Sequence, residues 1–307
     1  MIKDSQGRTI IFDAFIKNDK LYLISTYYAP TDSPITITLN GVSIIEEGYN
    51  QYEPVCYFVG PAPAEAAITI YVDGVPHIIT PEHIEPTSGD FAVATLFKHD
   101  YSRISDFVAY YRRQGCKKFY LYYNGPILPE SLPQAPDIVY RCWDFPYHNY
   151  VYGTEVADKH WIHCAQTTFL TTIRYRYMQD YTWFGLIDLD EWVHGPQPIL
   201  DMLRTAQTEV VVVKNHWAYR HNDIIDYNPV GLNHYERSKC FYRNTYSGVC
   251  GIHCPKGFAI TSMVDTLKML HIADDITDGG VSATHQYRIN SVGKNPATLL
   301  VTDLLKT

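Results

Sequence analysis

Residues 91–123 contain a strand–helix–strand pattern that restricts the fold of this chain more than any other segment. Residues 91–97 are an apolar run of strand length, and residues 118–123 form a second run rich in aromatic side chains. Between the two runs, apolar side chains recur at helical spacing: Ile104, Phe107, Val108 and Tyr111. Ser102 is the expected N-cap of this helix, and Gly115 is at its expected end. A helical crossover makes its two strands parallel, so the pattern predicts a βαβ unit.

The same alternation continues to about residue 213. Further strands are expected at 138–141, 183–188 and 210–213, with helices over about 154–177 and 199–206. Together these segments predict a three-layer α/β domain. Open α/β sheets bind ligands beyond the carboxyl ends of their strands, so functional side chains are expected at that edge.

The first 85 residues differ in pattern and in charge. Short strand-like segments are separated by turn sequences such as Asn18-Asp19, Asn40-Gly41 and Asp73-Gly74, with no helical spacing. This arrangement predicts a small antiparallel β-sandwich over residues 1–85, followed by a linker. Residues 1–90 carry 12 acidic and 4 basic side chains, whereas residues 91–307 carry 21 of each. The break in charge supports a domain boundary near residue 90.

Composition excludes several classes of protein. With 46% apolar residues the chain is not intrinsically disordered, and a net charge of −8 without a basic run argues against nucleic acid as a partner. No apolar stretch reaches the roughly 18–20 residues that span a bilayer, and the N-terminus lacks a signal peptide's apolar core. Seven scattered cysteines, an odd number, indicate reduced thiols of a cytoplasmic protein.

The strongest local signal is a buried-type strand that runs directly into Asp188, Asp190 and Glu191. Carboxylates at the carboxyl end of an α/β strand offer hard oxygen ligands to Mg²⁺ or Mn²⁺, and such an ion commonly bridges protein carboxylates and substrate phosphates. A solvated acidic loop is the alternative interpretation. The position after an apolar strand favours a metal site at Asp188 and Asp190.

Several segments together resemble glycosyltransferase family 92, formerly the domain of unknown function 23. The Asp-hydrophobic-Asp-Glu-aromatic motif of that family is matched by residues 188–192. The family's opening segment, the helix that follows and the next strand end are matched by residues 98–100, 104–114 and 122–124. Gln166 matches a glutamine ahead of the Asp motif. After the motif, residues 238–243, 251–253 and 285–291 match the family's lysine strand, histidine and closing segment. The resemblance covers about residues 91–292, most of the expected second domain.

The resemblance implies a GT-A-type, Rossmann-like catalytic domain over residues 90–307, preceded by a β-rich accessory domain over 1–85. The nucleotide sugar would contact Lys98, Asp100, Asn124, Asp188 and Lys239. A metal ion would be held by Asp188, Asp190 and His253, and a histidine ligand favours Mn²⁺ over Mg²⁺. A core histidine is the alternative for His253, and a surface lysine is the alternative for Lys239.

Characterised members of the family invert configuration, which implies a carboxylate base for the acceptor hydroxyl. Asp223, Asp226 and Glu236 lie between the metal motif and His253, and we rank Asp223 and Asp226 first. An ordinary loop carboxylate is the alternative for each. Trp217, in the same segment, is expected either to stack on a sugar ring or to pack in the core.

These observations predict a metal-dependent, inverting glycosyltransferase that moves a sugar, such as galactose or xylose, from a UDP-sugar to a glycan hydroxyl. A non-catalytic glycan-binding protein with a decayed transferase domain is the alternative. A glycoside hydrolase fits poorly, because it needs two carboxyl groups flanking the scissile bond rather than a metal-type pair. Animal members of the family carry a Golgi membrane anchor. Without such an anchor, we expect a soluble microbial or viral protein that acts in the cytoplasm. For a viral protein this would be the cytoplasm of the host. A Golgi enzyme is expected only if the chain is truncated.

Overall fold

The computed structural model describes residues 1–3, 9–26, 36–39, 42–43, 45–49, 55–147, 149–150, 161–162, 164–232, 237–255, 263–274, 291–292 and 296–304. The fold is mixed α/β, as predicted, and it is rich in strands. By its internal contacts the chain divides into two compact units, each discontinuous in sequence. The first combines Met1–Thr87 with Phe145–Asp180, and the second combines Ser88–Asp144 with Tyr181–Thr307.

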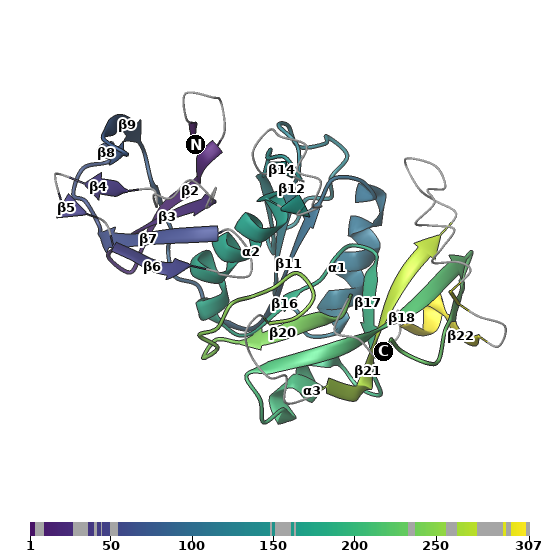
Figure 1. The fold of residues 1–307 in the computed structure, drawn as a ribbon. Helices are drawn as coiled ribbons and strands as arrows, with labels where there is room; N and C mark the ends of the chain where they lie inside the picture. Colours follow the sequence, from purple (N-terminus) through teal and green to yellow (C-terminus); the bar gives the residue numbers. More distant parts are fainter. Residues whose placement is uncertain are drawn as a thin grey trace. The chain divides into compact units, whose positions relative to one another are not determined.

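Small antiparallel sheets make up the first part of unit 1, as the turn-rich sequence predicts (Figure 1). Their strands are β1 (Ile2–Lys3), β2 (Thr9–Lys17), β3 (Lys20–Thr26), β4 (Ile37–Leu39), β5 (Val42–Ser43), β6 (Ile45–Tyr49), β7 (Val55–Pro61), β8 (Ile68–Val72), β9 (Val75–Ile79) and β10 (Glu82–His83). One sheet has the order β1-β2-β3-β7-β6, with β10 parallel to β2, and the other has the order β5-β4-β8-β9. Leu21 and Leu23 of the first sheet share one apolar core with Ile37 and Ile70 of the second.

A helix from later in the sequence also belongs to unit 1. α2 (Cys164–Arg176) and the 3₁₀ turn η2 (Met178–Asp180) follow the short strands β14 (Asn149–Tyr150) and β15 (Trp161–Ile162). The buried Arg176 guanidinium donates to both carboxylate oxygens of Asp13, at 2.6 and 2.7 Å, and to Glu82 at 3.0 Å. Lys17 donates to Asp180 at 2.7 Å. These buried ion pairs explain why residues 145–180, expected in the second domain, pack with the first unit.

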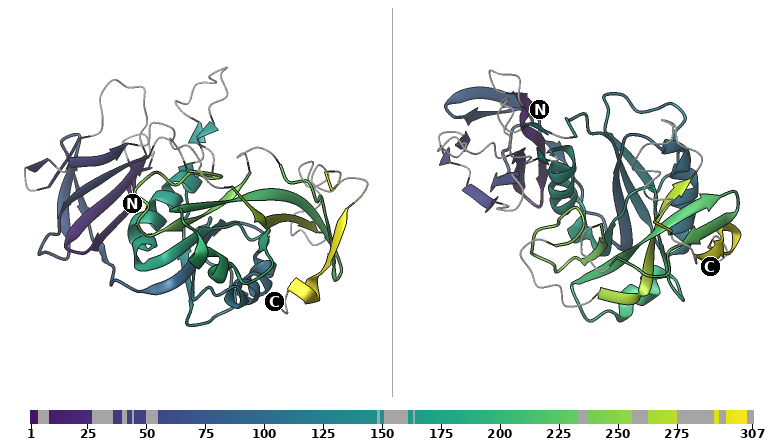
Figure 2. Two further views of the ribbon diagram at one scale, coloured as in Figure 1. Left: turned by 90° about the horizontal axis from the view of Figure 1, so that it is seen from below. Right: turned by 45° about the vertical axis from the view of Figure 1, so that its right-hand side comes forward.

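A ten-stranded mixed sheet forms the centre of unit 2. Its strands are β11 (Gly89–Phe97), β12 (Lys118–Tyr123), β13 (Ile138–Cys142), β16 (Tyr181–Leu186), β17 (Glu191–His194), β18 (Val210–His221), β19 (Ile224–Tyr227), β20 (Lys239–Arg243), β21 (Met263–Asp274) and β22 (Ala297–Leu300). Four parallel strands lie in the order β13-β12-β11-β16, and β20 follows antiparallel to β16. The long strands β18 and β21 lie side by side, in green and yellow-green in Figure 2.

The predicted βαβ unit is confirmed. β11 and β12 pair in parallel, and they are joined by the 3₁₀ turn η1 (Tyr101–Arg103) and helix α1 (Ile104–Arg113), whose apolar face is buried. Ser102, the expected N-cap, lies within η1 instead, and α1 has no side-chain cap. The chain leaves the helix through Gly115, where φ is +93° and a Cβ atom would lie 2.7 Å from Leu200, so only glycine fits.

The other helices of the second unit that lie within the described residues are short. They are α3 (Ile199–Thr205), which contains Leu200, and α5 (Val301–Leu304) near the end of the chain. The amide N–H of Ile199 donates to the Gln114 side chain at 3.1 Å, which fixes the start of α3 beside the end of α1. Within the described residues, no helix is both long enough and apolar enough to cross a membrane.

The strand order of unit 2 has a topological switch point between β11 and β16. From β11 the chain moves outward to β12 and β13, and it then returns to β16 on the other side of β11. Ligands of open α/β sheets bind beyond the carboxyl ends of the two strands that flank such a point. Residues that follow Phe97 and Leu186, the last residues of β11 and β16, therefore occupy the expected site.

The buried pair of Asp13 and Arg176 provides a test of this packing. Asp13→Asn removes the charge of the bidentate partner of Arg176 and leaves the more exposed Glu82 to face the buried guanidinium, so we expect the free energy of unfolding to fall by about 3 kcal/mol. Arg204→Gln is the control, because it breaks an exposed ion pair with Asp90 at 2.6 Å and should cost less than about 1 kcal/mol. Urea denaturation followed by circular dichroism measures both. Equal losses would contradict a special role for the buried pair.

Candidate functional site

The carboxylates that follow β16 are held in a tight turn. The Glu191 N–H donates to the Asp188 carbonyl oxygen at 3.1 Å, and the Glu191 carboxylate accepts from the Asp188 N–H at 2.8 Å. Leu189, between the two aspartates, is buried in the core and anchors the turn. The side chains of Asp188 and Asp190 are 38% and 19% exposed, whereas that of Glu191 is 1% exposed. The aspartates thus reach solvent, and the glutamate supports them from inside.

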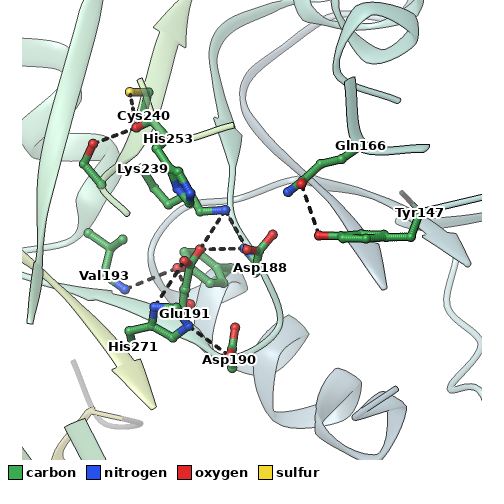
Figure 3. Close-up of polar contacts among 12 residues, drawn as sticks. Tyr147, Gln166, Asp188, Asp190, Glu191, Val193, Lys239, Cys240, His253 and His271 are labelled. Atoms are coloured by element: carbon green, nitrogen blue, oxygen red, sulfur yellow. Dashed lines mark hydrogen bonds and ion pairs between the residues drawn. The ribbon is translucent and has the colours of Figure 1, made fainter. Parts of the chain in front are cut away.

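A buried lysine balances part of this negative charge. Lys239 begins β20, and its Nζ lies 2.6 Å from Asp188 Oδ2 and 3.4 Å from Glu191 Oε2 (Figure 3). Burial alone would lower the pKa of Lys239, but the carboxylates of Asp188 and Glu191 raise it above its usual value. The ammonium group therefore stays charged, and it holds Asp188 and Glu191 together.

His271 brings a third element of the sheet to the site. β21 pairs antiparallel with β17 and places His271 opposite Glu191. The Nε2 atom of His271 lies 3.1 Å from Asp190 Oδ2, and its Nδ1 atom lies 3.8 Å from Glu191 Oε1. Within the described residues, one ligand atom from each of Asp190, Glu191 and His271 lies within 4.8 Å of the other two. These three side chains have the spacing and the donor types of a metal site.

The separation of Asp190 and His271 fits a shared divalent cation. Two ligands at right angles, each about 2.1–2.2 Å from an ion, are about 3.0 Å apart. That value is close to the 3.1 Å between Asp190 Oδ2 and His271 Nε2. Glu191 faces the other ring nitrogen, the position from which a carboxylate orients a metal-binding histidine. The residues present therefore fit an ion at Asp190 and His271, with Glu191 behind the ring.

Glu191 is a fixed support of the site. Burial raises the pKa of its carboxyl group well above the usual value, the charge of Lys239 opposes this rise, and Asp188 and Asp190 add to it. A cation at Asp190 would lower the pKa of Glu191, as the charge of Lys239 does. The Tyr111 hydroxyl donates to the Glu191 carbonyl oxygen at 3.0 Å. Glu191 is thus held by both its side chain and its backbone.

Trp217 packs against the candidate metal-binding histidine. Its ring centroid lies 4.9 Å from that of His271, and the side chain is 3% exposed. The guanidinium carbon of Arg237 lies 5.4 Å from the Trp217 ring centroid. Of the two interpretations of Trp217, core packing is the one observed, and the indole helps to fix the orientation of His271.

His253, the ligand implied by the resemblance, lies on the other side of the site, beside Lys239 (Figure 3). Its carbonyl oxygen accepts from the Ser238 hydroxyl at 2.7 Å. Burial and the charge of Lys239 lower the pKa of its ring to about 4, so the ring is neutral at pH 7. Within the described residues, the metal-type group includes His271 and not His253.

The residues expected to bind the donor divide into two groups. Lys98 is exposed and Asp100 half-buried, both just beyond the end of β11, and Asp100 has a left-handed backbone with φ of 58°. Asn124 is buried and donates from its side chain to the Trp143 carbonyl oxygen at 2.8 Å, which fixes the end of β13. Lys98 and Asp100 are thus at least partly exposed at the end of β11, whereas Asn124 is engaged in the scaffold.

Arg103 connects the end of β11 to the metal-type group. Its guanidinium donates to the Ile272 carbonyl oxygen at 3.3 Å, and the Ile272 N–H donates to the Asp190 carbonyl oxygen at 2.7 Å. The segment that contains Lys98 and Asp100 and the turn that contains Asp190 are therefore tied to the same residue of β21.

The two leading candidates for the base have different surroundings. Asp223 lies in the exposed turn between β18 and β19. Asp226 lies within β19, where its carboxylate accepts from the Thr298 hydroxyl at 2.7 Å and lies 3.7 Å from His221 Nε2. Glu236 is outside the described residues.

Register decides which of these carboxylates shares a face with the metal-type group. Trp217 is opposite His271, and Tyr219 is opposite Asp226. Residues two apart on a strand point to the same side, so Asp226 and His271 lie on one face, with Cα atoms about 12 Å apart from strand spacing and rise.

Sequence reasoning did not identify His271 or Arg103. The only sequence signal for His271 is a histidine within the apolar, strand-like run of residues 267–272. Its partner strand, β17, is 70 or more residues earlier in the chain. Local patterns do not specify such a long-range register.

No protein-family model matches this chain, and no curated protein matches it with significant similarity. The geometry of the site is therefore the basis for its functional interpretation.

Metal binding distinguishes the two histidines. We expect Mn²⁺ affinity to fall at least about tenfold in Asp190→Asn and in His271→Gln, because each loses a ligand atom. His253→Gln is the matched control and should stay within about threefold of the unaltered protein. Mn²⁺ titration followed by electron paramagnetic resonance measures all three. Lost affinity in His253→Gln with retained affinity in His271→Gln would contradict the site as described.

Proposed function

We propose that this protein is a metal-dependent, inverting glycosyltransferase that moves a sugar from a UDP-sugar to a glycan hydroxyl. The observation that carries the proposal is the distance of 3.1 Å between Asp190 Oδ2 and His271 Nε2. Asp190 follows β16 at the switch point of the sheet. A metal-type pair at that position suits a substrate with phosphate groups. Galactose is the first donor sugar to test, and xylose is the second.

The topology supports the finer fold assignment in this proposal, a GT-A-type, Rossmann-like domain. The parallel strands β13-β12-β11-β16 follow the order 3-2-1-4, which is how nucleotide-binding sheets of the Rossmann type begin. In such sheets the nucleotide lies beyond the carboxyl ends of the strands. We propose that the exposed Lys98 and the half-buried Asp100, beyond β11, contact it.

The charges of the site suit a diphosphate leaving group. A divalent cation at Asp190 and His271 would supply positive charge to the diphosphate as it departs. Lys239 keeps Asp188 oriented through the contact of 2.6 Å. With 38% of its side chain exposed, Asp188 is available to accept a hydrogen bond from a donor hydroxyl. Because Lys239 is buried, its role is to position Asp188 rather than to bind the phosphates.

Asp226 is the stronger candidate for the base that deprotonates the acceptor. It lies on the same face of the sheet as His271, whereas Asp223 lies in the turn beyond β18. The Thr298 hydroxyl at 2.7 Å holds one carboxylate oxygen, and the other faces His221. A base held in this way is oriented for proton removal.

Donor turnover tests the proposal. With Mn²⁺, release of UDP from UDP-galactose or UDP-xylose should be measurable, and it should stop in EDTA. Asp190→Asn should lower kcat/KM at least about 100-fold, the scale seen when charge stabilisation in the transition state is removed. Metal-independent turnover or full activity of Asp190→Asn would contradict the mechanism. Glycan binding without any turnover would favour the non-catalytic alternative.

The base is tested separately with an acceptor glycan. Asp226→Asn should lower kcat for transfer about 100-fold or more, because proton removal contributes that much, while Mn²⁺ affinity stays unchanged. Asp223→Asn is the matched control and should keep its activity within about twofold. Equal losses in the two variants, or loss only in Asp223→Asn, would refute the assignment of Asp226.

A further inference from the structure

A row of basic side chains crosses three strands of the second unit. In β21, Lys268 lies directly opposite His194 of β17 on one side and directly opposite Lys214 of β18 on the other. Directly opposite residues on neighbouring strands point to the same face of a sheet. All three side chains are half-buried. They therefore gather cationic or protonatable groups on one face of the sheet.

This row lies on the opposite face from the candidate metal site. His194 is three residues from Glu191, Lys268 three from His271, and Lys214 three from Trp217. Along a strand, side chains an odd number of residues apart point to opposite faces. The basic row is thus separate from the Asp190–His271 pair, although it uses the same strands, which lie side by side in Figure 1.

Two further residues extend the row into a cluster. Lys268 Nζ lies 3.5 Å from the Tyr227 hydroxyl and 5.3 Å from the centroid of its ring. The buried His216 has its ring edge against Tyr227, at a centroid distance of 6.1 Å, and its Nδ1 lies 2.8 Å from the Asn228 carbonyl oxygen. Because a carbonyl oxygen only accepts, Nδ1 is the protonated nitrogen. Tyr227 thus offers a hydroxyl beside the ammonium group of Lys268.

The electrostatic environment of the cluster is positive. Burial lowers the pKa of both His194 and His216, and the charge of Lys268 lowers both further. Lys214 adds to the effect at His216. Among the residues that the structure describes, none places a carboxylate within ion-pair distance of Lys268.

We propose that Lys268, Lys214 and His194, with the Tyr227 hydroxyl, form a binding site for a phosphate group. The ammonium groups act as charged donors to phosphate oxygens, and the N–H of a neutral imidazole and the tyrosine hydroxyl add neutral donors. The site is independent of the proposed transferase activity. The phosphate group is that of free inorganic phosphate or of a phosphorylated sugar, and the test separates these two sources.

The test is a titration of the full chain by isothermal calorimetry in EDTA, so that no metal-bound phosphate contributes. Inorganic phosphate and a hexose 6-phosphate are the two probes, and we expect saturable binding of at least one. Lys268→Gln should weaken it about tenfold or more, the equivalent of one charge-assisted hydrogen bond, and His194→Gln should weaken it about fivefold, the equivalent of one neutral hydrogen bond. The tighter probe identifies the source of the phosphate group.

Two control variants separate the cluster from general charge effects. Lys117→Gln removes an exposed lysine outside these three strands and should leave binding unchanged. Lys268→Arg keeps the charge and should retain binding within about threefold, which also shows that the position tolerates substitution. The absence of saturable binding by both probes would overturn the proposal. Retained binding in Lys268→Gln and His194→Gln, or equal weakening in Lys117→Gln, would overturn it too.

Discussion

The buried ammonium group of Lys239 is the interaction on which the candidate site depends. Three carboxylates within one turn would repel one another, and burying Glu191 among apolar strands would be costly without a nearby positive charge. Lys239 offsets both effects through its contacts with Asp188 at 2.6 Å and Glu191 at 3.4 Å. Because β20 lies next to β16, the lysine reaches the turn directly from the neighbouring strand. With Asp188 and Glu191 paired in this way, Asp190 remains for His271.

Local sequence patterns predicted much of the fold, because they reflect local physics. The apolar spacing over residues 104–111 and the glycine at 115 correctly located helix α1, and turn sequences correctly indicated the small antiparallel sheets. The packing of residues 145–180 depends on contacts between distant charges, such as Arg176 with Asp13. Those partners are 163 residues apart, so no local pattern reveals them. Ser102 shows the same limit at short range, since a 3₁₀ turn occupies the expected cap position.

The candidate site was predictable where it follows one strand and not where it joins several. Asp188 and Asp190 could be identified because they follow a buried strand at the carboxyl edge of an α/β sheet. His271 could not, because its place depends on the register of β21 against β17. Register also distinguishes Asp226 from Asp223, and it places Lys268 and His271 on opposite faces of one strand. Strand pairing thus determines both the face of the sheet that carries His271 and the opposite face, which carries Lys268.

The position of a bound ion tests the central claim most directly. Crystals grown with Mn²⁺ and UDP would show the ion by its anomalous scattering. The account predicts one peak about 2.1–2.3 Å from a carboxylate oxygen of Asp190 and from Nε2 of His271, with the UDP diphosphate on its solvent side. A peak coordinated by His253 instead, or UDP bound away from the ends of β11 and β16, would contradict it.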